Sequence, residues 1–335
     1  MNILFTCAGR RCYLLKYFKK VIGNSGNIIA ADMQLSAPAL TAADIKVQVP
    51  GVYADNYLDT VLDICKKYDV KVLISLNDLE LPILSARKKD FEAIGVNVVV
   101  SDPEVIDICF DKYKTAQFIE SLGLKTPKTY IDYNEAVDAI RTGVLKFPLI
   151  LKPRWGSGSI GLEFVDDLEE LEMVYKLDKK KVQKSILATA STDEKFLLIQ
   201  EVIKGAEYGL DIVNDFNKKH RGVSVKQKLS MRAGETDKAI TVDNARLREI
   251  GSVIGKSLKH IGNLDCDVLE RDGEYYVLEL NPRFGGGYPF SHEAGVNIPK
   301  AIVAWSQGED VPDSVFVPEY GKMFSKCDIL LNVGQ

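Results

Sequence analysis

The sequence predicts an α/β fold in the N-terminal third of the chain and an α+β fold in the remainder. Up to about residue 110, short apolar segments alternate with amphipathic segments of helical period, which is the pattern of a parallel sheet covered by helices on both faces. Farther along, several strands follow one another without a helix between them. With 335 residues, the chain is long enough for two domains.

The composition is that of a soluble globular protein, with 46% hydrophobic and 27% charged residues. A net charge of −4 without a basic block disfavours a nucleic-acid partner. Six scattered cysteines form no C-x-x-C pair, which favours reduced thiols in a cytoplasmic protein over a disulfide framework or a zinc site. No apolar run reaches the ~18 residues of a membrane span, so we expect no membrane partner either.

The first domain is predicted to contain strands and helices in alternation. The strands are Asn2–Thr6, Asn27–Asp32, Val70–Leu76 and Val96–Ser101, and the helices are Tyr13–Val21, Asp55–Tyr68 and Leu79–Ala93. No G-x-G-x-x-G follows the first strand, which argues against a NAD-dependent oxidoreductase. Parallel sheets bind ligands at the carboxyl ends of their strands. Gly9–Arg11, Asp32 and Asn77–Glu80 fall there, although turn or cap chemistry alone would account for each of them.

The second domain is predicted to begin near residue 110. Ser101–Glu104 has the signature of a helix start, and the helical pattern continues to about Leu122. The later strands are Phe147–Lys152, Leu162–Val165, Phe196–Gln200, Glu207–Val213, Arg221–Leu229 and Thr236–Val242, and the later helices are Asp167–Lys184, Asn244–His260 and Ile298–Ser306. We therefore divide the chain into residues 1–110 and 111–335.

A glycine-rich loop joins the first two of these later strands. It reads KPRWGSGSIG from Lys152 to Gly161, and no helix follows it, so it differs from a P-loop. Its small residues would let backbone N–H groups close on an anion, and Lys152 would add a positive charge. These small residues are Gly156, Ser157, Gly158, Ser159 and Gly161. A bare hairpin tip is the alternative, but a tip needs fewer glycines, so the sequence favours phosphate binding.

The segment Glu274–Gly287, EYYVLELNPRFGGG, reads as a strand that ends at a proline. Glu279 and Asn281 are two residues apart, so they share one face of this strand, and Leu278 and Leu280 are expected on the other. A carboxylate and a carboxamide side by side offer hard oxygen ligands, which suit Mg²⁺ shared with phosphates.

Asp267 lies on the preceding predicted strand, Leu264–Glu270, and Asp272-Gly273 predicts a hairpin turn between the two strands. A strict two-residue turn would place Asp267 opposite Leu278. Asp267 meets Glu279 only if the turn holds an odd number of residues or the hairpin contains a bulge. An edge hairpin with solvated carboxylates is the alternative to a metal site.

Three features now stand in chain order: a lysine before a glycine-rich strand–loop–strand, an acidic strand end at Glu201, and Asp267 followed by Glu279-x-Asn281. In this order the chain resembles the ATP-grasp superfamily, and within it the large-subunit branch of carbamoyl-phosphate synthases and small carboxylate–amine ligases. The resemblance covers nearly the whole chain. It implies a Rossmann-like pre-ATP-grasp domain to about residue 110, then an α+β ATP-grasp fold with a mobile lid subdomain at about residues 125–200.

The resemblance also implies roles for individual residues. The residues assigned to ATP are Lys112, Lys152, Gly156, Ser157, Gly158, Ser159, Gly161, Glu201, Val202, Ile203 and Glu207. Within this set the lysines and the loop would bind phosphates, Glu201 and Ile203 would meet adenine, and Glu207 would meet the ribose. Mg²⁺, with Mn²⁺ as the alternative metal, is assigned to Asp267, Glu279 and Asn281. Asp267 departs from the family pattern, since many relatives carry Glu or Gln there.

Arg283 is the residue that the resemblance places at the transferred phosphoryl group or the activated carboxylate, with Lys152 as a second catalytic residue. Its planar fork of donors matches either ligand, and lysine cannot reproduce that geometry. The glycines Gly285–Gly287 would let a substrate approach the backbone closely. Arg232 is a weaker catalytic candidate for the same cavity. The alternative for Arg283 is an ion pair that merely braces the turn.

The activity implied by the resemblance is an ATP- and Mg²⁺-dependent ligase of the EC 6.3 type. A carboxylate would attack the γ-phosphate of ATP, and an amine would capture the resulting acyl phosphate, so the expected partners are two small molecules. Two alternatives stay open: a carboxyphosphate-forming enzyme like carbamoyl-phosphate synthases or carboxylases, and a non-catalytic ATP-binding regulator. The chain has one synthase-like half and no glutaminase, which disfavours carbamoyl phosphate as its own product. A homodimer is left open as the assembly.

Overall fold

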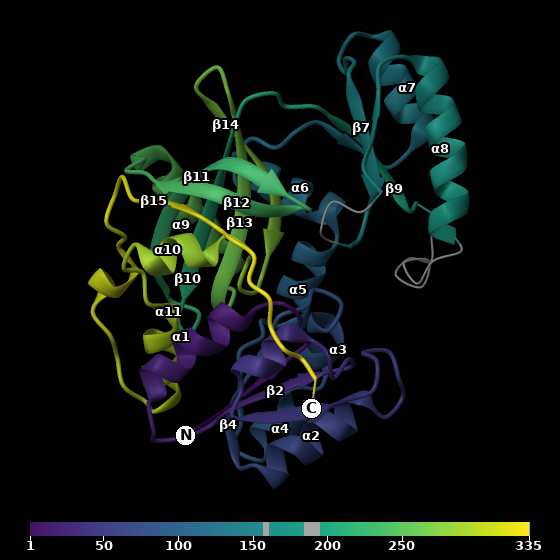
Figure 1. Cartoon of the computed structure of the whole chain (residues 1–335). Coiled ribbons are helices and arrows are strands. Elements are labelled where there is room, and N and C mark those ends of the chain that lie inside the picture. Colours follow the sequence, from purple (N-terminus) through teal and green to yellow (C-terminus); the bar gives the residue numbers. More distant parts are fainter. Residues whose placement is uncertain (157–160, 184–194, 335) are drawn as a thin grey trace.

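The computed structural model describes residues 1–156, 161–183 and 195–334. Three sheets organise these residues (Figure 1). The N-terminal sheet lies at one end of the molecule and the largest sheet in the middle. The third sheet stands with its two helices at the opposite end. The observed architecture confirms the predicted order of an α/β domain followed by an α+β fold.

The N-terminal sheet is parallel, with strand order β3-β2-β1-β4-β5. Its strands are β1 (Asn2–Thr6), β2 (Ile28–Asp32), β3 (Ile45–Gln48), β4 (Val70–Ser75) and β5 (Asn97–Val98). Helix α1 (Cys12–Ile22) packs on one face with Phe5, whereas α2 (Tyr57–Lys67), α3 (Leu81–Ala86) and α4 (Lys88–Glu92) pack on the other with Leu4. Both faces are covered, which is why the strands are apolar throughout.

Two helices connect this domain to the rest of the chain, α5 (Pro103–Phe110) and α6 (Lys112–Ser121). Ile106 of α5 belongs to the N-terminal core, whereas Val105 and Cys109 of the same helix pack in the core of the largest sheet. Because α5 serves both cores, the division at residue 110 stays a prediction.

The third sheet has the order β6-β9-β7-β8. Its elements are β6 (Thr129–Tyr130), α7 (Tyr133–Arg141), β7 (Leu149–Pro153), β8 (Glu163–Val165), α8 (Leu168–Gln183) and β9 (Leu197–Glu201). Strands β7 and β8 are antiparallel, which confirms the predicted strand–loop–strand around the glycine-rich segment. Ala136, Leu149 and Leu171 form the small core between the sheet and the two helices.

The largest sheet has the order β14-β13-β10-β11-β12-β15. Its elements and those around it are β10 (Ala206–Asn214), β11 (His220–Arg232), β12 (Glu235–Thr241), α9 (Ala245–Leu258), β13 (Gly262–Arg271), β14 (Glu274–Asn281), α10 (Tyr288–Glu293), α11 (Ile298–Ser306) and β15 (Met323–Ser325). Two short 3-10 turns, η1 (Pro38–Ala42) and η3 (Asp313–Phe316), complete the described elements.

The two faces of this sheet differ in polarity. On one face, Leu210, Cys266 and Leu280 pack beneath α5, α6 and α9. On the other face, neighbouring strands bring Lys228 opposite Glu207 and Asp265 opposite Asp211. Alternating residues of a strand point to opposite faces, so these charged positions of three strands gather on one surface.

Two predictions about the helices were wrong or incomplete. The single helix expected over Leu79–Ala93 is broken at Arg87, whose backbone leaves the helical region while its guanidinium pairs with Asp59 and Asp90. Helix α7 was not predicted, although Asp132 caps its start, a local signal that the sequence does carry.

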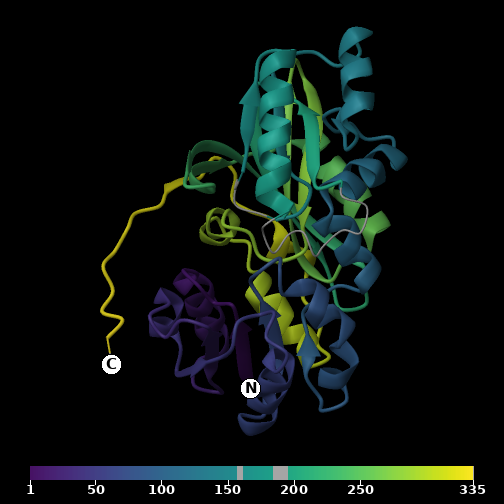
Figure 2. The same ribbon diagram turned by 90° about the vertical axis from the view of Figure 1, so that its right-hand side faces the viewer.

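Figure 2 shows the molecule turned by 90°, with the C-terminal segment running on the outside beyond β15. Among the described helices, none is both long and apolar enough for a bilayer span.

Candidate active site

A β-bulge in the hairpin of β13 and β14 brings Asp267 opposite Glu279. The two strands are joined by the predicted two-residue turn. If they paired without a bulge, this turn would place Asp267 opposite Leu278. The register shifts between Asp267 and Val268, and Asp267 then pairs with Glu279. A bulge adds one residue to one strand, so it reverses the parity and sets both carboxylates side by side.

The same bulge corrects the predicted faces of β14. Leu278 and Leu280 do not share the core face: Val277 and Leu280 lie in the core, and Leu278 is only partly buried. The inserted residue interrupts the alternation of the strand, so core positions fall three apart here instead of two.

Lys228 on β11 neutralises the acid on β13. Its ammonium donates to Asp267 Oδ1 at 2.7 Å and to Glu207 Oε1 at 2.8 Å. Burial raises the pKa of Asp267 to about 7, despite the opposing charge of Lys228. The predicted ribose ligand Glu207 therefore lies in the same charged cluster as the predicted metal ligand Asp267.

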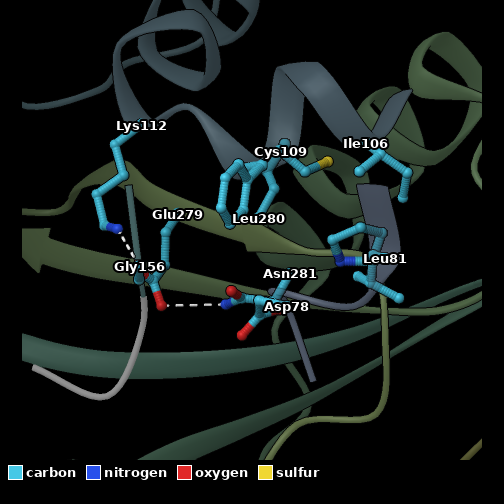
Figure 3. A pocket seen from close by; sticks show the side chains of 11 residues that line it. Asp78, Leu81, Ile106, Cys109, Lys112, Gly156, Glu279, Leu280 and Asn281 are labelled. Carbon is cyan, nitrogen blue, oxygen red and sulfur yellow. Dashed lines mark hydrogen bonds between the residues drawn. The ribbon is translucent and has the colours of Figure 1, made fainter. Parts of the chain in front are cut away.

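Glu279 is held in its charged form. Burial disfavours the carboxylate, but Lys112, a hydrogen bond from Asn281 and Lys152 together hold the pKa of Glu279 below its usual range. The amide nitrogen of Asn281 donates to Glu279 Oε1 at 3.0 Å. Figure 3 shows this hydrogen bond in the pocket that Lys112 also lines.

The two predicted phosphate-binding lysines come from different elements and approach Glu279 together. Lys112 opens α6, and its ammonium donates to the carbonyl oxygen of Gly156 (Figure 3). Lys152 lies on β7 and is 5% exposed. Burial, and then repulsion by Lys112, lower the pKa of the Lys152 ammonium to about 8. A phosphate partner would therefore stabilise the charged form of this buried lysine.

The donor set fits Mg²⁺ that is shared with a nucleotide. Asp267, Glu279 and Asn281 supply two carboxylates and one amide on neighbouring strands. Within the described part of the chain, no group of three or more His, Cys, Asp or Glu side chains could hold a metal ion. Mg²⁺ commonly takes one or two carboxylates and completes its shell with phosphate oxygens and water. The residues therefore suit a shared ion and not a protein-only metal site.

The sequence analysis assigned no role to Asp111 or Arg154. In the structure, this pair joins the segments that carry Lys112 and Lys152. Arg154 Nη2 donates to Asp111 Oδ2 at 2.7 Å, and Arg154 Nε donates to both carboxylate oxygens at 2.9 and 3.0 Å. The backbone nitrogen of Lys112 also donates to the carbonyl oxygen of Arg154 at 3.1 Å. Asp111 and Arg154 lie close in the sequence to Lys112 and Lys152, and this proximity was the one signal that could have predicted their role.

Replacing Asp111 by asparagine is expected to lower the free energy of unfolding by about 3–5 kcal/mol, because a charged partner is removed from a buried ion pair. Urea denaturation measures this change. Asp138→Asn, in an exposed pair with Arg141, is the matched control, and it should change stability by less than ~1 kcal/mol. Equal effects of the two substitutions would contradict a structural role for Asp111.

The residues assigned to adenine lie where β9 leaves the small sheet. The Glu201 carboxylate accepts from Arg271 Nη2 at 2.9 Å, Val202 is partly buried, and Ile203 is 7% exposed. Their contacts with adenine stay predictions. In the glycine-rich loop, Gly156 and Gly161 have φ values of 102° and 71°, a region that favours glycine. Ser157, Gly158 and Ser159 lie outside the described residues.

Arg283 reaches across to the N-terminal domain. Its Nη2 donates to Asp78 Oδ2 at 2.8 Å, and its Nη1 to Asp265 Oδ2 at 3.4 Å. The side chain is 9% exposed, and its pKa is raised because these two acids outweigh the burial that opposes its charge. Arg283 therefore pairs with acids of the N-terminal domain and of β13, whereas the alternative had it brace only its own turn. It also lines a cavity, and its catalytic role stays a prediction.

That cavity has a volume of about 290 Å³ and lies between the N-terminal domain and the polar face of the largest sheet. Arg11 and Asp78 line it from the N-terminal side, and Asp265 and Asp267 from the sheet. Gly286 and Gly287 line it as well, whereas a Cβ at Gly285 would come within 2.1 Å of the Asp265 carboxyl. Gly285 therefore makes room for Asp265.

Arg232 does not join Arg283. It lies at the end of β11 and is half exposed, and its guanidinium pairs with Asp328 at 2.5 Å and Asp237 at 3.1 Å. It is not among the described residues that line the 290 Å³ cavity. Its predicted position in that cavity is wrong, because acids of β12 and the C-terminal segment hold its side chain outside.

Comparisons with known proteins agree with this geometry. Residues 109–287 match the family described as the ATP-grasp domain, and residues 3–99 match the PylC-like N-terminal domain. The carbamoyl phosphate synthase large chain of Methanosphaerula palustris is 26% identical over 235 residues, which cover 68% of this chain and 21% of that protein. The chain therefore spans about a fifth of the length of such curated relatives.

Two solved structures show the same fold at low sequence identity. Biotin carboxylase from Campylobacter jejuni has a TM-score of 0.75 at 16% identity, over 95% of this chain and 73% of that one. The L-amino acid ligase from Bacillus licheniformis has a TM-score of 0.65 at 18% identity, over 94% and 76% of the two chains. With more than half of its residues in the matched domain, the chain belongs to the ATP-grasp family.

Proposed function

We propose that the protein is an ATP- and Mg²⁺-dependent ligase that activates a carboxylate as an acyl phosphate and joins it to an amine. The observation that carries this proposal is that three cations, Lys112, Lys152 and Arg283, all act on the Glu279 carboxylate. Glu279 lines the 290 Å³ cavity together with Asp267 and Arg283. Phosphoryl transfer is catalysed mainly by positioning and charge stabilisation, and this arrangement supplies both.

The phosphate end of the site is formed by the lysines and the hairpin. Lys112 and Lys152 bind phosphate oxygens, and the pair of Asp111 with Arg154 fixes the segments that carry them. Asp267, Glu279 and Asn281 would hold Mg²⁺, which neutralises phosphate charge when bound. Arg283 lies beyond the hairpin and orients the carboxylate substrate. The unit formed by β6–β9, α7 and α8 covers the nucleotide and excludes water from the acyl phosphate.

A screen for ADP release over pairs of carboxylic acids and amines tests this function. We expect release to require one acid and one amine together, with a product whose mass equals their sum less water. Release of ADP without either substrate, or no nucleotide binding at all, would contradict the proposal. Mg²⁺ and Mn²⁺ are compared in the same assay. A homodimer and a cytoplasmic location stay predictions.

The second candidate function is that of a carboxyphosphate-forming enzyme. To test it, bicarbonate is included among the acids of the ADP-release screen. The relatives named carbamoyl phosphate synthase large chain and the likeness to biotin carboxylase favour this candidate. ADP release that depends on bicarbonate alone would select it over the ligase. A third candidate, an ATP-binding regulator, predicts nucleotide binding with no ADP release under any combination.

Lys152→Met is expected to raise the free energy of unfolding at pH 7 by about 1–3 kcal/mol while weakening ATP binding. The folded pKa of Lys152, about 8, lies below its ordinary 10.5, so the charged form destabilises the fold below pH 8. This cost disappears as the pH rises from 8 toward 10.5. Denaturation at pH 7 and pH 10 should therefore show a gain at pH 7 that shrinks at pH 10.

The matched control is Lys146→Met, at an exposed lysine shortly before β7. It should change neither the free energy of unfolding nor the affinity for ATP. A lower stability of Lys152→Met at pH 7 would show that the lysine has a stabilising partner in the free protein, and it would remove the argument for a cation poised to bind phosphate.

A further inference from the structure

One wall of the 290 Å³ cavity is built from side chains that the proposed phosphoryl transfer does not use. Arg11 precedes α1, and Glu235 is the first residue of β12. Both line the cavity, and Arg11 Nη2 lies 3.9 Å from Glu235 Oε1. Arg11 is anchored through its other nitrogen, since Nη1 donates to the carbonyl oxygen of Phe284 at 2.6 Å. The wall therefore presents one cation and one anion, drawn from both domains.

Two buried polar atoms beside this wall lack a partner. Among the described residues, the Tyr13 hydroxyl and Arg283 Nε are buried without a hydrogen bond. Burial raises the pKa of Tyr13 to about 12, and the charges that act on its hydroxyl are those of Arg11, Glu235, Asp265 and Arg283. Buried polar groups in native proteins are nearly always hydrogen-bonded. Arg283 lines the cavity, so a polar ligand bound there would meet its guanidinium, whereas Tyr13 is not among the described residues that line the cavity.

Glu235 carries its charge in a partly exposed position. Burial opposes ionisation, but Lys326 and Arg11 hold the pKa of Glu235 below its ordinary value. Its carboxyl carbon would lie only 3.0 Å from a Cβ at Gly286, so the absence of a side chain at Gly286 leaves the carboxylate open toward the cavity. A carboxylate and a guanidinium 3.9 Å apart can each accept a ligand group of opposite charge.

The C-terminal segment already supplies a primary ammonium to Glu235. Strand β15 pairs with β12, and the backbone nitrogen of Lys326 donates to the carbonyl oxygen of Asp237 at 2.8 Å. This anchor places Lys326 Nζ 3.2 Å from Glu235 Oε2. Figures 1 and 2 show the segment continuing from β15 along the outside of the molecule, toward the level of the N-terminal domain. Lys326 thus occupies a position that a ligand ammonium could take.

We propose that Arg11 and Glu235 bind one substrate of the ligation, and that this substrate is a small zwitterion of the α-amino-acid class. Its carboxylate binds Arg11, and its ammonium displaces Lys326 from Glu235. This subsite rests on the proposed function only in naming the ligand a substrate, because the binding itself needs no turnover.

Calorimetry on the MgADP-saturated protein tests the subsite with the standard α-amino acids, in both enantiomers, as probes. At least one should bind, and its N-acetyl and carboxamide derivatives should each bind about tenfold more weakly, because each loses one charged contact. Glu235→Gln and Arg11→Met should each weaken binding of the same probe about tenfold, without changing the affinity for MgADP.

Lys326→Met should change the affinity for the probe in the opposite direction. Removing a competing ammonium from a partly exposed ion pair should strengthen binding of the probe about two- to fivefold. The matched controls are Lys322→Met and Glu319→Gln, which break an exposed pair at 2.9 Å in the same C-terminal segment. Neither control should change the affinity for the probe.

Three results would overturn the proposal: no amino acid binds, binding is insensitive to both Glu235→Gln and Arg11→Met, or Lys326→Met weakens binding. The proposed function fails separately. If an amino acid binds at Glu235 but no acid and amine pair releases ADP, the ligase assignment is wrong and the subsite stands. If ADP is released by a pair whose binding ignores Glu235 and Arg11, the ligase stands and the subsite is wrong.

Discussion

Replacing Glu279 by glutamine is expected to lower the rate of ADP release roughly 10²-fold or more while leaving the fold intact. Glutamine keeps the shape of the side chain and an oxygen that can accept from Asn281, but it removes the charge that faces Lys112 and Lys152. In the proposed site this carboxylate would be a ligand of Mg²⁺, so the substitution would remove one negative charge from the metal ligands. The measurement is ADP release at saturating ATP and Mg²⁺, together with the free energy of unfolding.

Glu274→Gln is the matched control for this prediction. Glu274 begins the same strand, is exposed, and pairs with Lys125 at 3.0 Å, far along β14 from the site. It should keep native turnover. Near-native activity of Glu279→Gln at ordinary Mg²⁺ would remove Glu279 from the proposed metal set, and an equal loss in both variants would point to damage of the hairpin.

Replacing Arg283 by lysine is expected to keep ATP binding and to lose acid-dependent ADP release, by about 10²-fold. The guanidinium meets Asp78 and Asp265 through two nitrogens of one plane, and a lysine ammonium cannot reach both carboxylates in that geometry. The carboxylate substrate would lose its orienting group, whereas the lysines that face the phosphates are untouched. Calorimetry measures nucleotide affinity, and a coupled assay measures ADP release on the same preparation.

Arg221→Lys is the control for a buried, bridging arginine away from the site. Arg221 is 7% exposed and pairs with Asp310 and Asp313 near α11. Its replacement should cost stability but leave the dependence on acid unchanged. If Arg283→Lys instead loses ATP affinity while its residual turnover keeps the native dependence on acid, then Arg283 belongs to the nucleotide site.

Much of the fold could be predicted because its signals are local. Alternating apolar segments predicted the parallel sheet around β1 and β4, and the glycines between β7 and β8 predicted the strand–loop–strand. Three short strands, β3, β6 and β15, were missed, because two to four residues show no hydrophobic period of their own. Strands β5 and β8 are equally short, but they lie within the predicted segments Val96–Ser101 and Leu162–Val165. Their position is set by the neighbouring strand to which they pair.

The candidate site was also predicted only in part. The sequence by itself determined that Glu279 and Asn281 share a face, since two positions along a strand return to the same side. Only the tertiary structure decided that Asp267 faces Glu279, because a bulge costs one residue of register and leaves no mark in the composition of the strand.

The tertiary structure also decided the surroundings of the two arginines. Arg283 meets Asp78 from 205 positions away, and Arg232 is held outside the cavity by Asp328 from 96 positions away. Sequence alone determined which side chains carry charge and where each strand ends. It could not pair them, because contacts between distant segments depend on how the two domains and the C-terminal segment pack, and no local pattern records that packing.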